Sequence, residues 1–189
     1  MRASLQSLAA LLAVLLCTDI AHADKAVLLD EEEWKAKMEA ATAIQKKAME
    51  MKAEIQFYKD NPDKFQGNEV KEAQNKQAKL FLQTGKELAE LSGQTKDKNL
   101  SDLTLLRAAQ NYMRAEAFIT ASKLFDKLSL DDATEKETRA QALYWNGLCQ
   151  ERMQAMDEAK RLYMAITKEY PDSKWAKYAR GRLHDPVFH

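Results

Sequence analysis

The 189 residues carry a formal net charge of zero, because 29 lysine and arginine side chains balance 29 aspartate and glutamate side chains. This balance gives no electrostatic reason to expect nucleic acid or an anionic membrane surface as a partner. With 5 glycines, 3 prolines and 2 cysteines, the chain has few helix breakers and too few thiols for a disulfide framework, so packing has to stabilise it.

Residues 1–23 have the layout of a secretory signal peptide. Arg2 supplies a positive start, residues 8–17 form the apolar run LAALLAVLLC, and Ala-His-Ala at 21–23 is a small-x-small cleavage site. The apolar run is too short to cross a bilayer as a helix, which takes about 20 residues. We therefore predict cleavage on export; the alternative is a buried N-terminal helix.

Export sets the expected location and covalent state of the mature chain. That chain would begin at Asp24, lie in the periplasm or outside the cell, and contain no transmembrane span. Cys149 would be its one remaining cysteine, which excludes an internal disulfide. An alternative cleavage would leave Cys17 as a lipidated first residue, but Leu16 before it is larger than the small residue typical of that pattern.

Residues 24–100 are predicted to form a long helical hairpin. Its first helix starts with a capping box, in which Asp30 is the N-cap and Glu33 stands three residues later, and Leu29 and Trp34 can close a hydrophobic staple. This helix is predicted to run to about Lys59. Its apolar positions follow a narrow seam of the coiled-coil kind, formed by Trp34, Met38, Ala41, Ile44, Ala48, Met51, Ile55 and Tyr58.

A second long helix is predicted from about Asn68 to Leu91, after Asn-Pro-Asp at 61–63 has ended the first and with Gly93 as its stop. The two helices are expected to fold back on each other. The alternative is that residues 30–59 pair with a second copy and make the protein a homo-oligomer. The inward side of the second helix is formed by Val70, Ala73, Gln77, Leu80, Phe81, Leu88 and Leu91.

Residues 101–189 are predicted to form shorter helices. Ser101 is expected to cap the first of them, Thr134 and Glu137 form a second capping box, and Asp157 is expected to cap a later helix. Since no segment alternates apolar and polar residues in the manner of a strand, the predicted fold class is all-α. The expected ranges are Asp102–Arg114, Glu116–Leu128, Glu135–Met153, Glu158–Glu169 and Lys174–Leu183.

An internal repeat appears when the chain is compared with itself at the offset that places Ala109 on Gly147. Gly147 stands in a helix interior, where glycine costs about 1 kcal/mol relative to alanine. We interpret it as the point where the paired helix crosses closely, because packing can offset this cost. The other pairs matched at this offset are Leu105 and Leu143, Ala121 and Ala159, Leu124 and Leu162, Phe125 and Tyr163, and Leu128 and Ile166.

At these residues the chain resembles the tetratricopeptide repeat, a two-helix unit of about 34 residues. Gly147, Ala159, Tyr163 and Pro171 supply the family's order of small residue, alanine, aromatic residue and proline, while the first copy lacks the proline. The ending EYPDSKWAKYARGRL is similar to the YbgF-like and BamD-like groups of cell-envelope proteins. The resemblance implies a short α-solenoid of antiparallel helix pairs at about 102–135 and 140–173, closed by a capping helix at 174–183.

The resemblance also implies a binding groove on the first helix of each repeat. Paired arginines in such a groove could hold a peptide carboxylate through two hydrogen bonds. The alternative is that Leu103, Leu106 and Leu148 belong to the core. The candidate protein-binding residues are Gln110, Met113, Arg114, Tyr144, Leu148, Glu151 and Arg152, with Leu103, Leu106 and Gln141 at the remaining groove positions.

No arrangement of residues in the sequence indicates catalysis, a metal or a cofactor. His184 and His189 have no metal-ligand partner at helical spacing, and Cys149 has no histidine near it in the sequence. The sequence therefore predicts an exported, non-enzymatic scaffold that binds another envelope protein or peptide through its repeats. The alternative is a structural protein whose first helix self-assembles and whose repeats only cap it.

Overall fold

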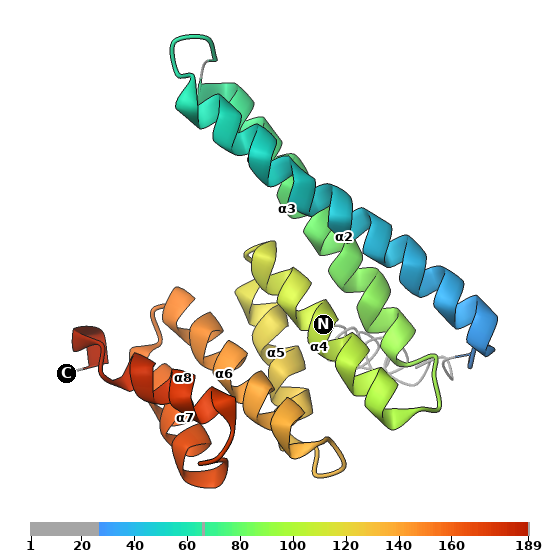
Figure 1. Ribbon diagram of the computed structural model, residues 1–189, viewed down its shortest axis with the longest axis vertical. Helices are drawn as coiled ribbons and strands as arrows, with labels where there is room; N and C mark the ends of the chain where they lie inside the picture. Colours follow the sequence, from blue (N-terminus) through green and yellow to red (C-terminus); the bar gives the residue numbers. More distant parts are fainter. Residues whose placement is uncertain (1–26, 66, 189) are drawn as a thin grey trace, which may run out of the picture.

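The computed structural model describes residues 27–65 and 67–188, and this part of the chain is all-α, as the sequence predicts (Figure 1). The predicted signal peptide at 1–23, with its cleavage site, lies outside the described residues. No strand occurs in the described part. The elements are α2 (Glu31–Asp60), α3 (Gly67–Ser92), α4 (Lys98–Arg114), α5 (Phe118–Leu130), α6 (Lys136–Arg152), α7 (Met156–Glu169), α8 (Lys174–Leu183) and the 3-10 helix η1 (Pro186–Phe188).

The start of α2 follows the predicted cap. The backbone N–H of Glu33 donates to Asp30 Oδ1 at 2.8 Å, so one free donor of the first turn has a partner. Three glutamates in that turn complement the positive end of the helix dipole, and Lys35 pairs with Glu31 at 2.5 Å. At the other end, Asn61 Nδ2 donates to the carbonyl of Phe57 at 2.9 Å.

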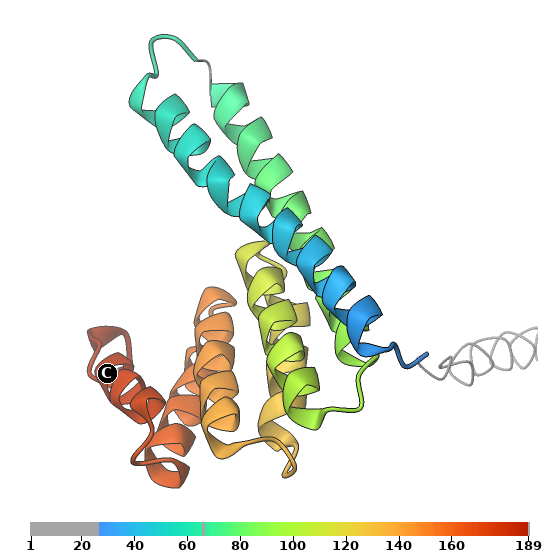
Figure 2. The ribbon, with the colours of Figure 1, turned by 45° about the vertical axis from the view of Figure 1, so that its right-hand side comes forward.

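Helices α2 and α3 run side by side in opposite directions and extend well past the other helices (Figures 1 and 2). Met51 and Ile55 of α2 pack with Ala73 of α3, and Gln77 Nε2 donates to the carbonyl of Ala48 at 2.8 Å. Near the stack, Trp34 Nε1 donates to the carbonyl of Leu91 at 3.3 Å. The apolar seam of α2 is therefore covered by α3 within one chain.

Helix α4 begins earlier than predicted, and Ser101 is not its cap. Asp97 is the N-cap, and its Oδ1 accepts a hydrogen bond from the N–H of Leu100 at 3.0 Å. Ser101 instead donates its hydroxyl to the carbonyl of Ser92 at 2.7 Å. The carboxylate one turn upstream starts the helix, which frees the serine to satisfy a carbonyl at the end of α3.

The caps predicted for α6 and α7 are also wrong. Thr134 donates to Asp102 Oδ2 at 2.9 Å, so its hydroxyl ties the α5–α6 loop to α4 instead of capping α6. Glu137 accepts from the hydroxyl of Ser173 at 2.7 Å. Asp157 lies in the first turn of α7, which begins at Met156. In each case a partner distant in the sequence, or an earlier helix start, takes the place of the local cap.

The sequence repeat appears in the backbone of the described chain. Helices α4, α6 and α8 begin at Lys98, Lys136 and Lys174, which are separated by the same offset that places Ala109 on Gly147. Glu116 and Gln154, separated by that offset too, occupy the same place after α4 and α6 and have positive φ angles of 60° and 64°. The prediction that Glu116 belongs to a helix is therefore wrong, since this left-handed residue turns the chain into α5.

The hydrogen bonds of these two turns repeat as well. Ala117 N–H donates to the carbonyl of Tyr112 at 2.9 Å, and Ala155 N–H donates to the carbonyl of Gln150 at the same distance. Each element of the series α2 to α8 packs on the next along the chain, and α4 contacts α6 as α6 contacts α8. The result is a row of helices with α4, α6 and α8 on one side and α5 and α7 on the other (Figures 1 and 2).

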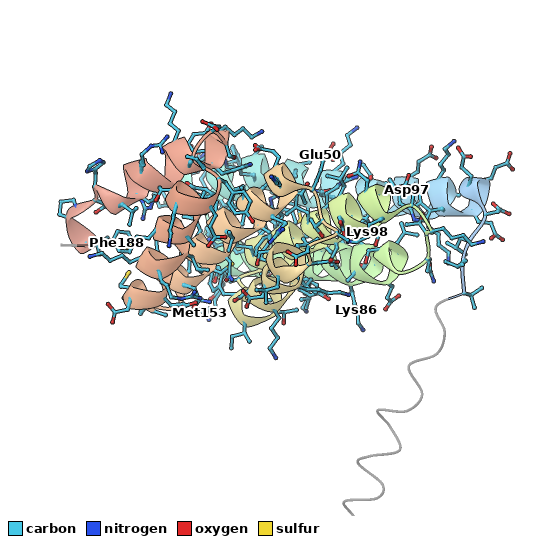
Figure 3. The ribbon with its side chains drawn as sticks, turned by 90° about the horizontal axis from the view of Figure 1, so that it is seen from below. Glu50, Lys86, Asp97, Lys98, Met153 and Phe188 are labelled. Atoms are coloured by element: carbon cyan, nitrogen blue, oxygen red, sulfur yellow. The ribbon has the colours of Figure 1, made fainter. Side chains whose placement is uncertain are left out.

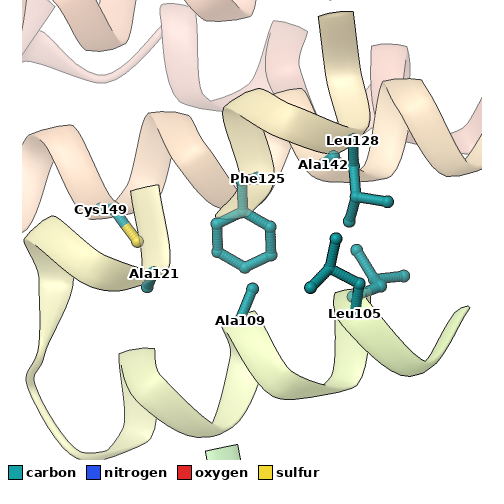
Figure 4. Close-up of a cluster of buried hydrophobic side chains, with 8 residues drawn as sticks. Leu105, Ala109, Ala121, Phe125, Leu128, Ala142 and Cys149 are labelled. Carbon is teal, nitrogen blue, oxygen red and sulfur yellow. The ribbon is translucent and has the colours of Figure 1, made fainter. Parts of the chain in front are cut away.

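A core runs through this row. Phe125 is fully buried, and its ring lies among small side chains such as Ala109 and Ala121 (Figure 4). In the second pair, a Cβ on Gly147 would stand 2.7 Å from Tyr163 Cζ and closer still to Cε1, so the ring of α7 lies directly on the glycine. This confirms the interpretation of Gly147 as a close crossing point.

Candidate protein-binding face

The predicted groove residues lie on the outer side of α4 and α6. We define the outer face as the set Leu103, Gln110, Met113, Arg114, Gln141, Tyr144, Leu148, Glu151 and Arg152. Arg114 and Arg152 are exposed and Leu103 is 42% exposed, whereas the other members are partly buried. Leu106, at 4% exposure, belongs to the core, as the alternative interpretation of the leucines predicts.

Each of the two arginines lies over an aromatic ring of the preceding helix. The guanidinium carbon of Arg114 is 5.9 Å from the ring centroid of Phe81, and that of Arg152 is 5.6 Å from the centroid of Phe118. Although part of the Arg114 side chain is exposed, the surrounding protein partly desolvates its guanidinium, and this, followed by the nearby positive charge of Arg107, lowers the pKa of Arg114. Neither guanidinium forms an ion pair within 4.0 Å among the described residues. These cation–π contacts use the ring face and leave the N–H donors of each arginine free for an anionic partner.

Tyr144 is part of an aromatic cluster that the sequence did not predict. Its ring centroid lies 5.3 Å from that of Trp175, 5.8 Å from Tyr163 and 5.9 Å from both Trp145 and Tyr178. Burial raises the pKa of the Tyr144 hydroxyl. Because Trp175 and Tyr178 belong to α8, this helix closes one end of the outer face. The α6 rings and the α8 rings are about 30 residues apart in the sequence and meet only in the fold.

Glu151 is not available to a partner in the way that its predicted role requires. It accepts a hydrogen bond from the Tyr163 hydroxyl at 2.6 Å and two from Arg182, through Nε at 3.0 Å and through Nη2. Its side chain is 12% exposed. The hydrogen bond from Arg182 to Glu151 raises the pKa of Arg182. Burial, and then the separate hydrogen bond from its own hydroxyl to Glu151, raise the pKa of Tyr163. Glu151 therefore joins α6 to α7 and α8.

Two hollows lie away from the outer face. One of about 680 Å³ sits where α2 begins, between Trp34, Lys35 and the α3–α4 link with Leu100. Another of about 560 Å³ lies among α5, α6 and α7, and its lining includes Asp126, Leu130, Glu158 and Arg161. Burial and the charge of Glu158 raise the pKa of Asp126, although Asn146 Nδ2 donates to it at 2.6 Å. Apart from the raised pKa of Asp126, neither hollow combines groups in a pattern typical of catalysis.

The groups that could carry chemistry are few in the described residues. Cys149 is fully buried, and burial raises its pKa to about 12, which keeps the thiol protonated and unreactive. Residues 27–65 and 67–188 contain no group of three or more histidine, cysteine or acidic side chains placed to hold a metal ion. In the same residues no helix combines the length and apolar character that crossing a bilayer requires.

Comparison of the sequence with protein-family models, and of the chain with curated proteins and solved structures, gives no match. The case for a function therefore depends on the molecule's own geometry.

Proposed function

We propose that the chain is an exported, non-enzymatic adaptor whose helix pairs α4–α5 and α6–α7 form a short tetratricopeptide-type solenoid. Its outer face binds a protein or peptide of the cell envelope. The observation that carries the proposal is the constant repeat offset, which sets the helix starts and the left-handed turn residues Glu116 and Gln154 alike. A repeated two-helix unit without an enclosed reactive site is typical of binding scaffolds.

The outer face gives this proposal its chemistry. Arg114 and Arg152 occupy equivalent positions on α4 and α6 and keep donors free above Phe81 and Phe118. Exposed arginine over an aromatic ring, on the same face as an exposed leucine, combines a residue type that contributes strongly to binding energy in protein interfaces with some apolar contact. A peptide with acidic side chains or a terminal carboxylate fits this surface best.

Self-assembly through α2 has less support. The seam of α2 is buried against α3, with Met51 7% and Ile55 6% exposed, so these residues leave little apolar surface for a second copy. A sedimentation measurement of the exported chain separates the two functions, since the adaptor proposal expects a monomer and the structural alternative expects an oligomer.

Photo-crosslinking from two helices tests the adaptor proposal directly. A photoreactive phenylalanine at Leu103, on the outer face of α4, is expected to capture another envelope protein in cells. The same group at Lys123, an exposed position on α5, is the matched control and is expected to capture none. Equal crosslinking from both positions, or crosslinks only between copies of the chain, would contradict the adaptor proposal.

A further inference from the structure

Helix α8 is the third member of a series in which the first two members are each followed by a helix. The series starts at Lys98, Lys136 and Lys174, which are evenly spaced along the chain. Helix α5 covers α4 and α7 covers α6, but only the three-residue η1 follows α8 in the described chain. Phe188 of η1 packs on Tyr163 of α7, with ring centroids 5.9 Å apart, so η1 is held against α7.

Positions that α4 and α6 bury are open on α8. Asp102 and Leu105 of α4 are 6% exposed, Ala140 of α6 is fully buried, and Leu143 of α6 is partly buried. The residues of α8 in the same register are Tyr178, which is 52% exposed, and Gly181, around whose Cβ position nothing lies within 4 Å. A glycine inside an exposed helix costs about 1 kcal/mol relative to alanine. The close packing that explains Gly147 does not occur at Gly181 within the described chain.

The open side of α8 is strongly basic. The helix contains lysines and arginines at 174, 177, 180 and 182 and no acidic residue. Arg182 is engaged by Glu151, and Lys174 lies 5.2 Å from the ring centroid of Trp175. Among the described residues, Lys177 and Arg180 form no ion pair within 4.0 Å. The exposed tyrosine and glycine are thus bordered by free positive charges.

We propose that the open face of α8, formed by Lys174, Lys177, Tyr178, Arg180 and Gly181, binds one acidic amphipathic helix of a separate protein. The helix would lie beside α8 as α5 and α7 lie beside α4 and α6. Gly181 admits a large side chain, as Gly147 admits the ring of Tyr163. Acidic residues on both sides of that apolar stripe pair with the lysines and arginine.

The charges on α5 and α7, the helices that cover α4 and α6, argue against the same helices of a second copy as the occupant. Helix α5 has two lysines and one aspartate, and α7 has three basic and three acidic residues, so neither offers an acidic partner. The zero net charge of the chain argues against an anionic membrane, which a strongly basic protein would favour. Charge complementarity therefore points to a different, acidic chain.

A helical peptide with the apolar residues of α7 is the probe for this site. The acidic version of Met156–Glu169 carries Lys160→Glu, Arg161→Glu and Lys168→Glu, and a hydrocarbon staple on its solvent side holds it helical. The matched basic version carries Asp157→Lys, Glu158→Lys and Glu169→Lys instead. Fluorescence anisotropy with the full chain is expected to show saturable, salt-sensitive binding of the acidic peptide and at least tenfold weaker binding of the basic one.

Three variants locate the binding. Lys177→Glu is expected to weaken the acidic peptide at least tenfold, whereas Lys123→Glu on α5 changes it less than twofold. Gly181→Leu fills the open position and is expected to cause a similar loss without lowering the thermal midpoint, because nothing lies within 4 Å of the new Cβ. Crosslinking from Leu103 should persist in Gly181→Leu, so this site and the outer face can fail separately.

Several outcomes would overturn the proposal. They are no saturable binding of the acidic peptide, equal binding of both peptides, or unchanged binding in Lys177→Glu and Gly181→Leu. If the wild-type chain forms dimers and Gly181→Leu is monomeric, the occupant of the open face is a second copy of the chain. If the chain pellets with vesicles of anionic lipid, Lys177→Glu abolishes this pelleting and the acidic peptide does not bind, the occupant of the open face is a membrane.

Discussion

The pairs α4–α5 and α6–α7 share one backbone but differ in the chemistry at equivalent positions. In the first pair the fully buried aromatic residue is Phe125, and Met113 packs against the same core. In the second pair the equivalent residues are Tyr163 and Glu151, which are hydrogen-bonded to each other and, through Glu151, to Arg182 of α8. The second pair thus uses a polar link where the first uses apolar contact.

This difference shows how a short row of helices can end. An apolar position suits the interior of the row, where another pair follows. Glu151 instead meets Arg182, whose side chain is 33% exposed, so the charges are only partly removed from water and their desolvation costs less. Figure 3 places Phe188, after α8, and Asp97, before α4, toward opposite ends of the molecule, with charged side chains pointing outward along its length. The polar link belongs to the C-terminal end.

The largest effect is expected from breaking the close crossing of the second pair. Gly147→Ala puts a methyl group within 2.7 Å of Tyr163 Cζ, and the buried ring has little room to move. The higher helix propensity of alanine does not offset this clash. We therefore expect Gly147→Ala to lower the free energy of unfolding by about 1–3 kcal/mol, and Gly147→Leu to lower it further. Urea unfolding measures both. Gly181→Ala is the control and should stabilise the chain by up to about 1 kcal/mol.

The polar link is tested by making the second pair resemble the first. Glu151→Met leaves Arg182 and the buried Tyr163 hydroxyl without their acceptor, and we expect a loss of about 1–3 kcal/mol in urea unfolding. Adding Tyr163→Phe removes the orphaned hydroxyl and should recover part of this loss. Strict additivity of the two single variants would show that the residues are not energetically linked.

The two helix pairs should also differ in how stability depends on pH. At the repeat position where the first pair has Asn111, the second has the titratable thiol of Cys149. Burial raises the pKa of Cys149 from 9.0 to about 12, so above pH 9 the unfolded chain releases the thiol proton and the folded chain keeps it. This contribution to stability is present below pH 9 and falls by about 1.4 kcal/mol per pH unit toward pH 12. Unfolding at pH 8, 9 and 10 should show a shallower decline in Cys149→Ala. Identical declines would mean that the thiol ionises normally.

Helix positions were largely predictable from sequence, because they depend on local composition and on few breakers. The bounds of α8 agree with the expected range Lys174–Leu183, and the end of α4 at Arg114 was also predicted. Caps were less predictable, since several acceptors compete within one turn. Asp97 lies one turn before Ser101, and the sequence does not reveal that Ser101 has a partner in Ser92.

The outer face was predictable by position but not by partner. Repeat register places both Glu151 and Arg152 in the predicted groove. In the structure Arg182, 31 residues away, binds Glu151, while Arg152 lies over Phe118. The aromatic cluster around Tyr144 also depends on α8, whose docking angle is a tertiary property. The interval between Lys136 and Lys174, which equals the repeat offset, could have indicated that α8 continues the series.

The smallest effect on folding, and the largest on binding, is expected from Arg114 and Arg152. An exposed cation–π contact contributes about 0.5–1 kcal/mol, so Arg114→Ala and Arg152→Ala should each lower stability by no more than that. Arginine at an interface centre often contributes about 2 kcal/mol or more to affinity. The double variant should therefore bind the partner crosslinked from Leu103 at least tenfold more weakly, since about 1.4 kcal/mol corresponds to one decade.

The control for the arginine pair is Arg161→Ala on α7, which removes an exposed arginine that pairs with Glu158 at 2.5 Å and is not on the outer face. It should change neither affinity nor stability appreciably, because exposed ion pairs contribute little.

The single variants Arg114→Ala and Arg152→Ala also compare the two helix pairs as binding surfaces. If both touch the partner, Arg114→Ala and Arg152→Ala each weaken it, and the partner spans α4 and α6. If only Arg152→Ala does, the partner sits at the C-terminal end, beside the aromatic cluster, and the first pair serves as support. Unchanged affinity in the double variant would remove the outer face as the binding surface.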